Sequence, residues 1–167
     1  RGTIKTGDSL YIHEIAKSVT VAAMERKRVV IDKATVGEEV SMQITGVTKA
    51  EVSRGYTLSK KDTLQEYDRF LATVYVYTED EGGKHTPLMD STKETYFPNL
   101  RFNDTYSTKQ ARMFFPEGTS MVLGGETVED VRFYLPTSTP GFIGRSFVLT
   151  ESGKTIAKVE ITEVHKH

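Results

Sequence analysis

Hydrophobic and polar residues alternate with a period of two along much of this chain. The alternation is clearest in four segments, 17–24, 39–45, 131–135 and 157–163. In the second of these, Val40, Met42 and Ile44 share one face, and polar residues occupy the other. This pattern predicts half-buried antiparallel strands. Segment 70–77 is apolar on both faces, which predicts a strand that is covered on both sides.

Turn sequences separate the predicted strands, at 7–8, 82–83, 116–118, 124–125 and 152–153. In segment 115–118, proline at the second position and glycine at the fourth predict a type I turn. The only helical turn expected lies at 48–54, where Thr48 caps it, Glu51 completes a capping box and Gly55 ends it. Many short strands with close turns are typical of barrels or sandwiches, so we expect an all-β fold.

The polar stretch 60–66 is the best candidate for a domain boundary. The 167 residues are 37% hydrophobic and 27% charged, which is ordinary for a globular protein, and the net charge is −1. That charge argues against a strongly basic protein that coats nucleic acid. The absence of cysteine excludes disulfides and thiolate metal sites. Since no apolar run approaches roughly 18 residues, we expect no membrane insertion.

Common catalytic motifs are missing from the sequence. It contains neither GxxxxGK[ST] nor GxGxxG, and neither GxSxG nor HExxH. His165 and His167 flank Lys166 in what we expect to be a solvated tail rather than a metal site. The carboxylates of 79–81 resemble a surface turn. We therefore expect no enzymatic activity, no catalytic residue, no metal and no cofactor in this chain.

Two short cationic segments follow predicted strands. In segment 81–87, Gly82 and Gly83 permit positive φ and a close approach of backbone, and Lys84 and His85 follow them. Such a loop can hold phosphates and ribose hydroxyls, or it can be a hairpin connection with a solvated Lys-His pair. Segment 26–28 (Arg-Lys-Arg) offers the same two interpretations. The residues alone favour the structural interpretation for both segments.

Segment 81–87, EGGKHTP, resembles the EGG[RK]HTP loop that opens the third domain of translation elongation factor Tu. Further segments resemble that family in the same order along nearly the whole chain. They are 1–8 (RGxIKxGD in the family), 36–40 (AGENV), 46–58 (RGIKREEIERGxxLA), 115–122 (LPEGxxMVMPG), 144–149 (GLRFAI) and 151–156 (EGGRTVG).

The resemblance implies two antiparallel β-barrels packed side by side. Residues 1–62 would form a barrel like the second domain of the family, with its opening strands expected to precede Arg1. Residues 67–167 would form a barrel like the third domain. In the family, a separate domain binds GTP and Mg²⁺, and we expect that domain to lie outside this chain.

The resemblance also implies contacts with aminoacyl-tRNA. The family's EGGRHTP loop lies against the T-stem backbone, and a Glu and an Arg of the second domain surround the tRNA 3′ end. The residues that match RNA-binding positions are Lys84, His85, Thr86, Glu25, Arg28, Gly153 and Lys154. Departures from the family include Glu39 in place of an Asn, Ser152 in place of a Gly, and most of segment 89–112.

Two functions remain open on this basis. The chain can be the barrel portion of a mitochondrial elongation factor Tu, presenting a surface that binds aminoacyl-tRNA or the ribosome. Alternatively, it is a relative without the GTPase domain that serves as a structural subunit of a mitochondrial ribosome or another large assembly. The expected partners are aminoacyl-tRNA or ribosomal RNA, together with proteins of such an assembly. The mitochondrial location is expected because divergence of this kind is typical of organellar factors.

Overall fold

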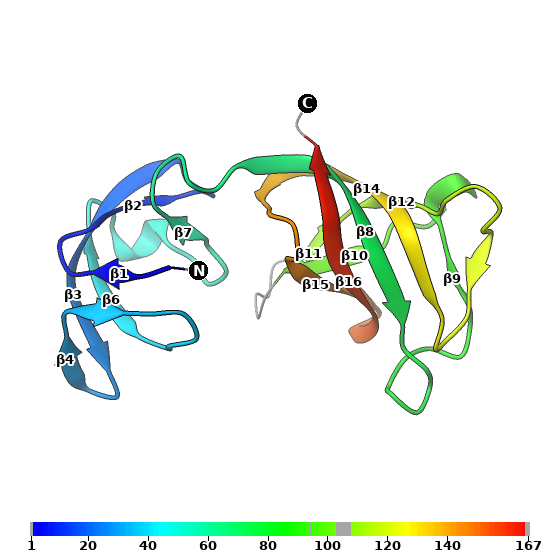
Figure 1. Ribbon diagram of the computed structural model, residues 1–167, viewed down its shortest axis with the longest axis horizontal. Helices are drawn as coiled ribbons and strands as arrows, with labels where there is room; N and C mark the ends of the chain where they lie inside the picture. The colour runs from blue at the N-terminus through cyan, green and yellow to red at the C-terminus, as the bar shows by residue number, and fades with distance from the viewer. Residues whose placement is uncertain (1, 94, 103–107, 166–167) are drawn as a thin grey trace. The chain divides into compact units, whose positions relative to one another are not determined.

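A computed structural model describes residues 2–93, 95–102 and 108–165. The chain divides into two compact units, Arg1–Leu64 and Gln65–His167. The division falls inside the polar stretch that the sequence singled out as a boundary. Apart from two short 3-10 turns, the regular elements of the described residues are β-strands, so the all-β prediction is confirmed (Figure 1).

The described residues of the first unit form seven strands. They are β1 (Ile4–Lys5), β2 (Ser9–Ile12), β3 (Lys17–Arg26), β4 (Val29–Ile31), β5 (Lys33–Ala34), β6 (Ser41–Thr45) and β7 (Leu58–Ser59). Strand β3 pairs with β2, β4 and β6, β7 joins β2, and β1 and β5 form a separate pair, all antiparallel. This unit is therefore built from two sheets, and a complete barrel is not clear in it.

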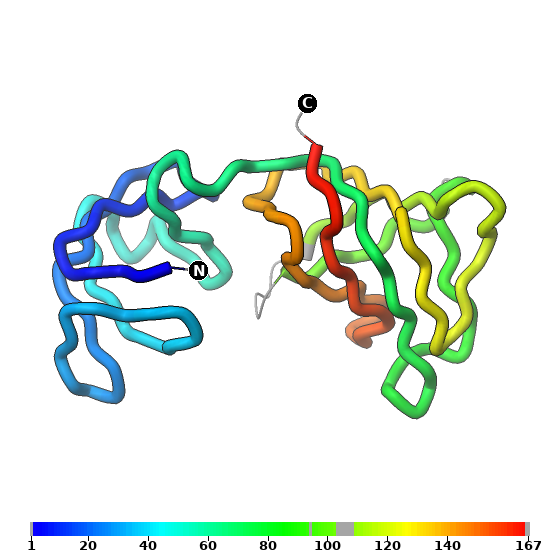
Figure 2. Tube along the Cα trace, in the orientation of Figure 1, coloured from blue at the N-terminus to red at the C-terminus, as the bar shows by residue number. Residues whose placement is uncertain are grey.

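The second unit is a nearly closed antiparallel barrel. Its strands are β8 (Glu66–Val76), β9 (Leu88–Met89), β10 (Asn99–Phe102), β11 (Thr108–Gln110), β12 (Arg112–Phe114), β13 (Met121–Val122), β14 (Thr127–Pro140), β15 (Ser146–Glu151) and β16 (Lys154–His165). Seven of them form one sheet in the order β11-β10-β15-β16-β8-β14-β12. Strands β11 and β12 are separated by Ala111 alone, and they are the two opposite ends of this order, where β11 pairs with β10 and β12 pairs with β14. The continuous course of the chain can be followed in Figure 2. This one segment therefore brings the ends of the sheet together.

The alternation in β8 explains the core of the barrel. Phe70 and the apolar residues that follow at every second position, up to Val76, are buried. Phe70 stacks on Phe133, with 5.1 Å between ring centroids, and Phe147 meets both rings edge-on. The intervening residues of β8, from Leu71 to Tyr75, are only partly buried. The prediction that both faces of this strand are covered is therefore wrong for its outer face, where apolar and tyrosine side chains border solvent.

The predicted turn at 115–118 is displaced by one residue. The amide of Thr119 donates to the carbonyl of Pro116 at 3.2 Å, and Gly118 has a φ of 87°. Glycine thus occupies the third position of a turn that begins at Pro116. A positive φ at that position is the signature of a type II turn rather than type I.

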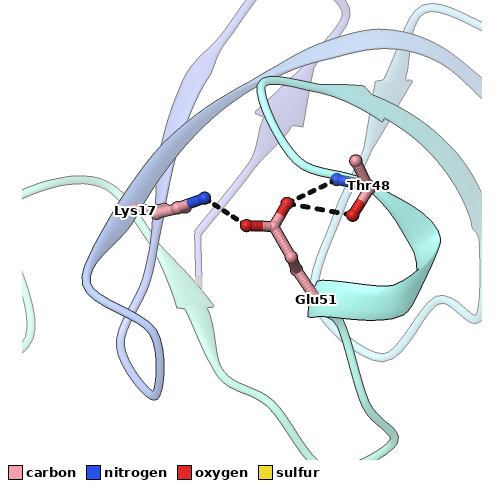
Figure 3. A network of polar contacts seen from close by, with 3 residues as sticks. All are labelled: Lys17, Thr48 and Glu51. Carbon is pink, nitrogen blue, oxygen red and sulfur yellow. Dashed lines mark hydrogen bonds and ion pairs between the residues drawn. The ribbon is translucent and has the colours of Figure 1, made fainter.

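A 3-10 turn, η1 (Lys49–Glu51), forms within the predicted helical turn at 48–54, but it ends at Val52, before Gly55. A second 3-10 turn, η2 (Ser91–Lys93), was not predicted. The carboxylate of Glu51 accepts hydrogen bonds from the amide of Thr48 at 2.8 Å and from its hydroxyl at 3.1 Å, as expected of a capping box (Figure 3). Its other oxygen forms an ion pair with Lys17 of β3. The hydrogen bond from Lys17, followed by that from the Thr48 amide, lowers the pKa of Glu51 from 4.5 to about 2. The turn is thereby attached to the sheet.

This network predicts an acid-dependent contribution to the stability of the first unit. Because the pKa of Glu51 is lower in the folded state, its stabilisation is complete above pH 4.5 and is lost as the pH falls through about 2. Glu51→Gln should therefore lower the stability of the first unit at pH 6 and make no difference near pH 2. Carboxyl-detected NMR gives the pKa directly, and urea unfolding at the two pH values gives the difference. Glu39→Gln, at an exposed side chain, is the control. A Glu51 carboxyl that titrates near 4.5 would contradict the prediction.

Candidate functional site

The loop that follows β8 is held at its start by Glu81. Its carboxylate accepts hydrogen bonds from the amide of Thr78 and from the hydroxyl of Tyr75, both at 2.9 Å. The bond from the Thr78 amide is the main cause of a lowered pKa of Glu81. The bond to the carboxylate is the main cause of a raised pKa of Tyr75. The loop therefore leaves the barrel in a fixed direction.

The two glycines of this loop have the roles that the sequence predicts. Gly82 has a φ of 88°, in the left-handed region. The amide of Gly83 donates to the carbonyl of Thr78 at 2.8 Å. A Cβ atom at Gly83 would lie 2.2 Å from the carbonyl oxygen of Tyr77, and no side chain can occupy that position without moving backbone.

Lys84 is turned toward the protein rather than toward solvent. Its Nζ lies 2.8 Å from Oε2 of Glu151, and only 17% of its side chain is exposed. The hydroxyl of Tyr96 donates to the same oxygen at 3.3 Å, and the Lys84 ammonium lies 5.4 Å from the centre of the Tyr96 ring. Burial, and then the charge of Glu151, raises the pKa of Tyr96 far above its usual value. Lys84 thus connects the loop to the end of β15.

Glu151 precedes the two-residue turn between β15 and β16. Ser152 and Gly153 have φ values of 49° and 80°, and Glu151 pairs with Lys154 across the hairpin. Positive φ at both central residues is the geometry of a type I′ turn, which matches the twist of paired strands. The side chain of Lys154 is exposed at the base of this turn.

The Lys84–Glu151 ion pair therefore brings together two segments that are far apart in sequence. We call segments 81–87 and 151–154 the loop cluster. It contains five of the seven predicted RNA-binding residues: Lys84, His85, Thr86, Gly153 and Lys154. His85 is 85% exposed, and its Nδ1 lies 3.1 Å from Oε2 of Glu79. The cationic and donor groups that remain accessible in the cluster are therefore those of His85, Thr86 and Lys154.

The other two predicted residues, Glu25 and Arg28, belong to the first unit. Arg28 lies in the two-residue turn between β3 and β4, where Lys27 and Arg28 have φ values of 51° and 66°. Glu25 and Arg28 are exposed. Arg26 forms an ion pair with Glu38, which ties segment 36–40 to β3. A hydrogen bond from the Thr35 amide is the main cause of a lowered pKa of Glu38.

Sequence reasoning missed the two residues that hold Lys84. Glu151 was visible as the first residue of a motif that resembles the family, but nothing in its spacing indicates a partner 67 positions away. Tyr96 lies in the segment that departs most from the family, so no pattern pointed to it. Polar residues of this kind come together only when the barrel folds. The sequence around each residue does not show which residue becomes its partner.

Three further observations concern metal binding, membrane spanning and relationship to known protein families. Among the described residues, no group of three or more His, Asp or Glu side chains is placed to hold a metal ion. In the same residues, no helix has the length and apolar character needed to span a membrane. A search with models of known protein families found no match to this chain.

Proposed function

We propose that this chain is the barrel portion of a mitochondrial elongation factor of the Tu type, which presents the loop cluster to aminoacyl-tRNA or ribosomal RNA. One observation carries the proposal: the two segments that resemble the family's T-stem loop and its EGGRTVG turn lie together, joined by Lys84 and Glu151. The antiparallel pairing of β8 with β16 places the end of β8 and the start of β16 at the same end of the barrel. The mitochondrial location rests on the divergence of the sequence alone.

The charges of the cluster indicate how RNA would be held. Glu151 neutralises Lys84, so Lys84 acts by positioning the loop. Lys154 and His85 are then the groups that can reach phosphates, and the backbone at Gly153 is free of a side chain. Contacts of this kind are independent of base sequence and weaken with salt. We therefore expect weak, salt-sensitive binding that is similar for all tRNAs.

A salt series with charged tRNA tests this function. Lys154→Ala should weaken binding and lower the slope of log affinity against log salt by about one unit, because one phosphate contact is lost. Glu151→Gln should strengthen binding at low salt, since it removes a negative charge and leaves Lys84 unneutralised. Fluorescence anisotropy with labelled aminoacyl-tRNA, from 25 to 200 mM salt, measures both effects.

Lys158→Ala is the matched control, because Lys158 is another exposed lysine of β16. It should leave the affinity and the slope almost unchanged. If Lys154→Ala and Lys158→Ala lose affinity equally, the binding is non-specific and the loop cluster is not the site. If the wild type shows no binding at 25 mM salt, the tRNA function is wrong.

One observation favours the second function, a structural subunit of a mitochondrial ribosome or another large assembly. Lys84, the most distinctive cation of the motif, is largely covered by Tyr96 and Glu151. Its charge is paired inside the protein and is not presented to a ligand. In a structural subunit, the loop cluster would shape a contact with neighbouring molecules rather than recognise tRNA. Cross-linking in mitochondrial extracts followed by mass spectrometry distinguishes the two, because a subunit yields cross-links from His85 or Lys154 to fixed protein or RNA neighbours of one assembly.

A further inference from the structure

The outer surface of β12 and β14 carries arginines and aromatic rings in alternation. The register of these antiparallel strands places Arg112 opposite Tyr134. It places Phe114 opposite Arg132. Directly opposed residues project from the same face of a sheet, and the residues between them on both strands are buried in the core. The four side chains therefore share the outer face, where β12 and β14 run side by side (Figure 1).

These four side chains line a hollow of about 440 Å³. A second hollow of about 330 Å³ shares Arg112 and Tyr134 and extends past Phe97. We call the surface formed by Arg112, Phe114, Arg132 and Tyr134 the outer groove. The rings of Phe114 and Tyr134 meet edge-on, with 5.7 Å between their centroids and an angle of 79° between their planes. Flat apolar surface is thus held in a fixed arrangement at the floor of the groove.

The outer groove is locally positive in a chain whose net charge is −1. Arg112 and Arg132 are exposed, and within the described part of the chain neither has a carboxylate at ion-pair distance. A third guanidinium, that of Arg69 on β8, lies 5.6 Å from the centre of the Tyr134 ring. On β16, the next strand beyond β8, Oε1 of Glu163 lies 2.9 Å from Nε2 of His165. The guanidinium groups of three arginines therefore lie on or beside the outer groove.

We propose that the outer groove binds an unpaired nucleic-acid strand. Guanidinium groups match the geometry of phosphate oxygens, and Arg112 and Arg132 would hold successive phosphates. Bases of an unpaired strand can stack on Phe114 and Tyr134, whereas a duplex keeps its base faces inside the helix. An acidic peptide would satisfy the arginines but not the ring faces. The groove shares no residue with the loop cluster, so this inference does not rest on the proposed function.

Anisotropy with a fluorescein-labelled octauridine (U8), on the full chain between 25 and 200 mM salt, tests the inference. Arg112→Gln and Arg132→Gln should each lower the slope of log affinity against log salt by about 0.7, the value for a single strand. Phe114→Leu and Tyr134→Leu should each weaken binding by about fivefold or more and leave the slope unchanged. The arginine variants therefore report on phosphate contacts, and the aromatic variants report on stacking.

Three comparisons make the test decisive. Arg101→Gln, at an exposed position of β10, is the matched control and should leave U8 binding unchanged. Lys158→Ala, at an exposed position of β16, is a second control and should also leave U8 binding unchanged. The DNA octamer dT8 shows which kind of single strand the groove binds. Binding equal to that of U8 indicates a site for any single strand, and weaker binding indicates a site that prefers RNA.

Other results would overturn the inference. It fails if U8 does not bind at 25 mM salt, if duplex RNA binds as tightly as U8, or if the two leucine variants bind like the wild type. It also fails if an octaglutamate peptide displaces U8 at equal concentration, because the groove would then recognise negative charge alone. Circular dichroism of each variant confirms that the fold is retained, as expected for outward-facing positions.

Discussion

Gly83→Ala should be the most damaging single substitution in the loop cluster. Its Cβ would lie 2.2 Å from the carbonyl oxygen of Tyr77 and 2.8 Å from that of Thr78, and both atoms belong to the backbone directly after β8. The backbone can yield only by giving up the hydrogen bond from Gly83 to Thr78. We expect a loss of about 3 kcal/mol or more in the unfolding free energy of the second unit. Guanidinium unfolding, followed by amide signals of the barrel, measures it.

Gly82→Ala is the matched control for that experiment. Gly82 has a φ of 88°, but no atom lies within 4 Å of the position of its Cβ. The cost should therefore be the conformational one alone, about 1–2 kcal/mol. Equal losses for the two variants would show that crowding at Gly83 is relieved by movement of the loop, contrary to the argument from backbone contact.

Hydrogen exchange should show the first unit opening well before the second. Among the described residues, the core of the first unit contains six buried apolar side chains, from Leu10 to Ala34, and that of the second contains twenty-one. Burial of apolar area is the main stabilising contribution to folding, and small units have little of it. Amides of β3 should therefore have protection factors at least about tenfold lower than those of β8.

Mass spectrometry of peptides from the two units, in the full chain at neutral pH, gives this comparison. Peptides that contain only exposed turns must be left out, because they exchange quickly in both units. The fair comparison is between the hydrogen-bonded amides of β3 and those of β8, each of which is paired with strands on both edges. Equal protection of the two would mean that the units unfold together and stabilise each other.

The sequence predicted those structural features that depend on residues close together in the chain. Alternation identified β3, β6, β14 and β16, and the spacing of Thr48 and Glu51 identified the capping box at η1. The adjacent Gly82 and Gly83 predicted both a positive φ and a close approach. Each of these features depends on residues within a few positions of each other, and their chemistry can be read directly from the chain.

Features that depend on closure of the barrel could not be predicted in the same way. The outer face of β8 was expected to be covered, because an apolar segment does not reveal how many layers pack on it. Lys84 was expected to project from its loop, because its partners come from elsewhere in the chain: Tyr96 from the segment before β10, and Glu151 from the end of β15. The outer groove, with its arginines and aromatic rings, was not predicted for the same reason. Their alternation across two strands is visible only once the register of β12 and β14 is known.

The position of β8 in the sheet has a consequence for the synthesis of the protein. This strand pairs with β14 through Phe70 and Phe133, and with β16 through Ala72 and Ile161, so both of its neighbours are distant in sequence. Pairings between distant segments form late, since the intervening chain must first be brought together. As the chain leaves the ribosome, one edge of β8 stays unpaired until β14 has emerged, and the other stays unpaired until β16 has emerged. For that period, its buried face and its unpaired edges are exposed to chaperones and to other nascent chains.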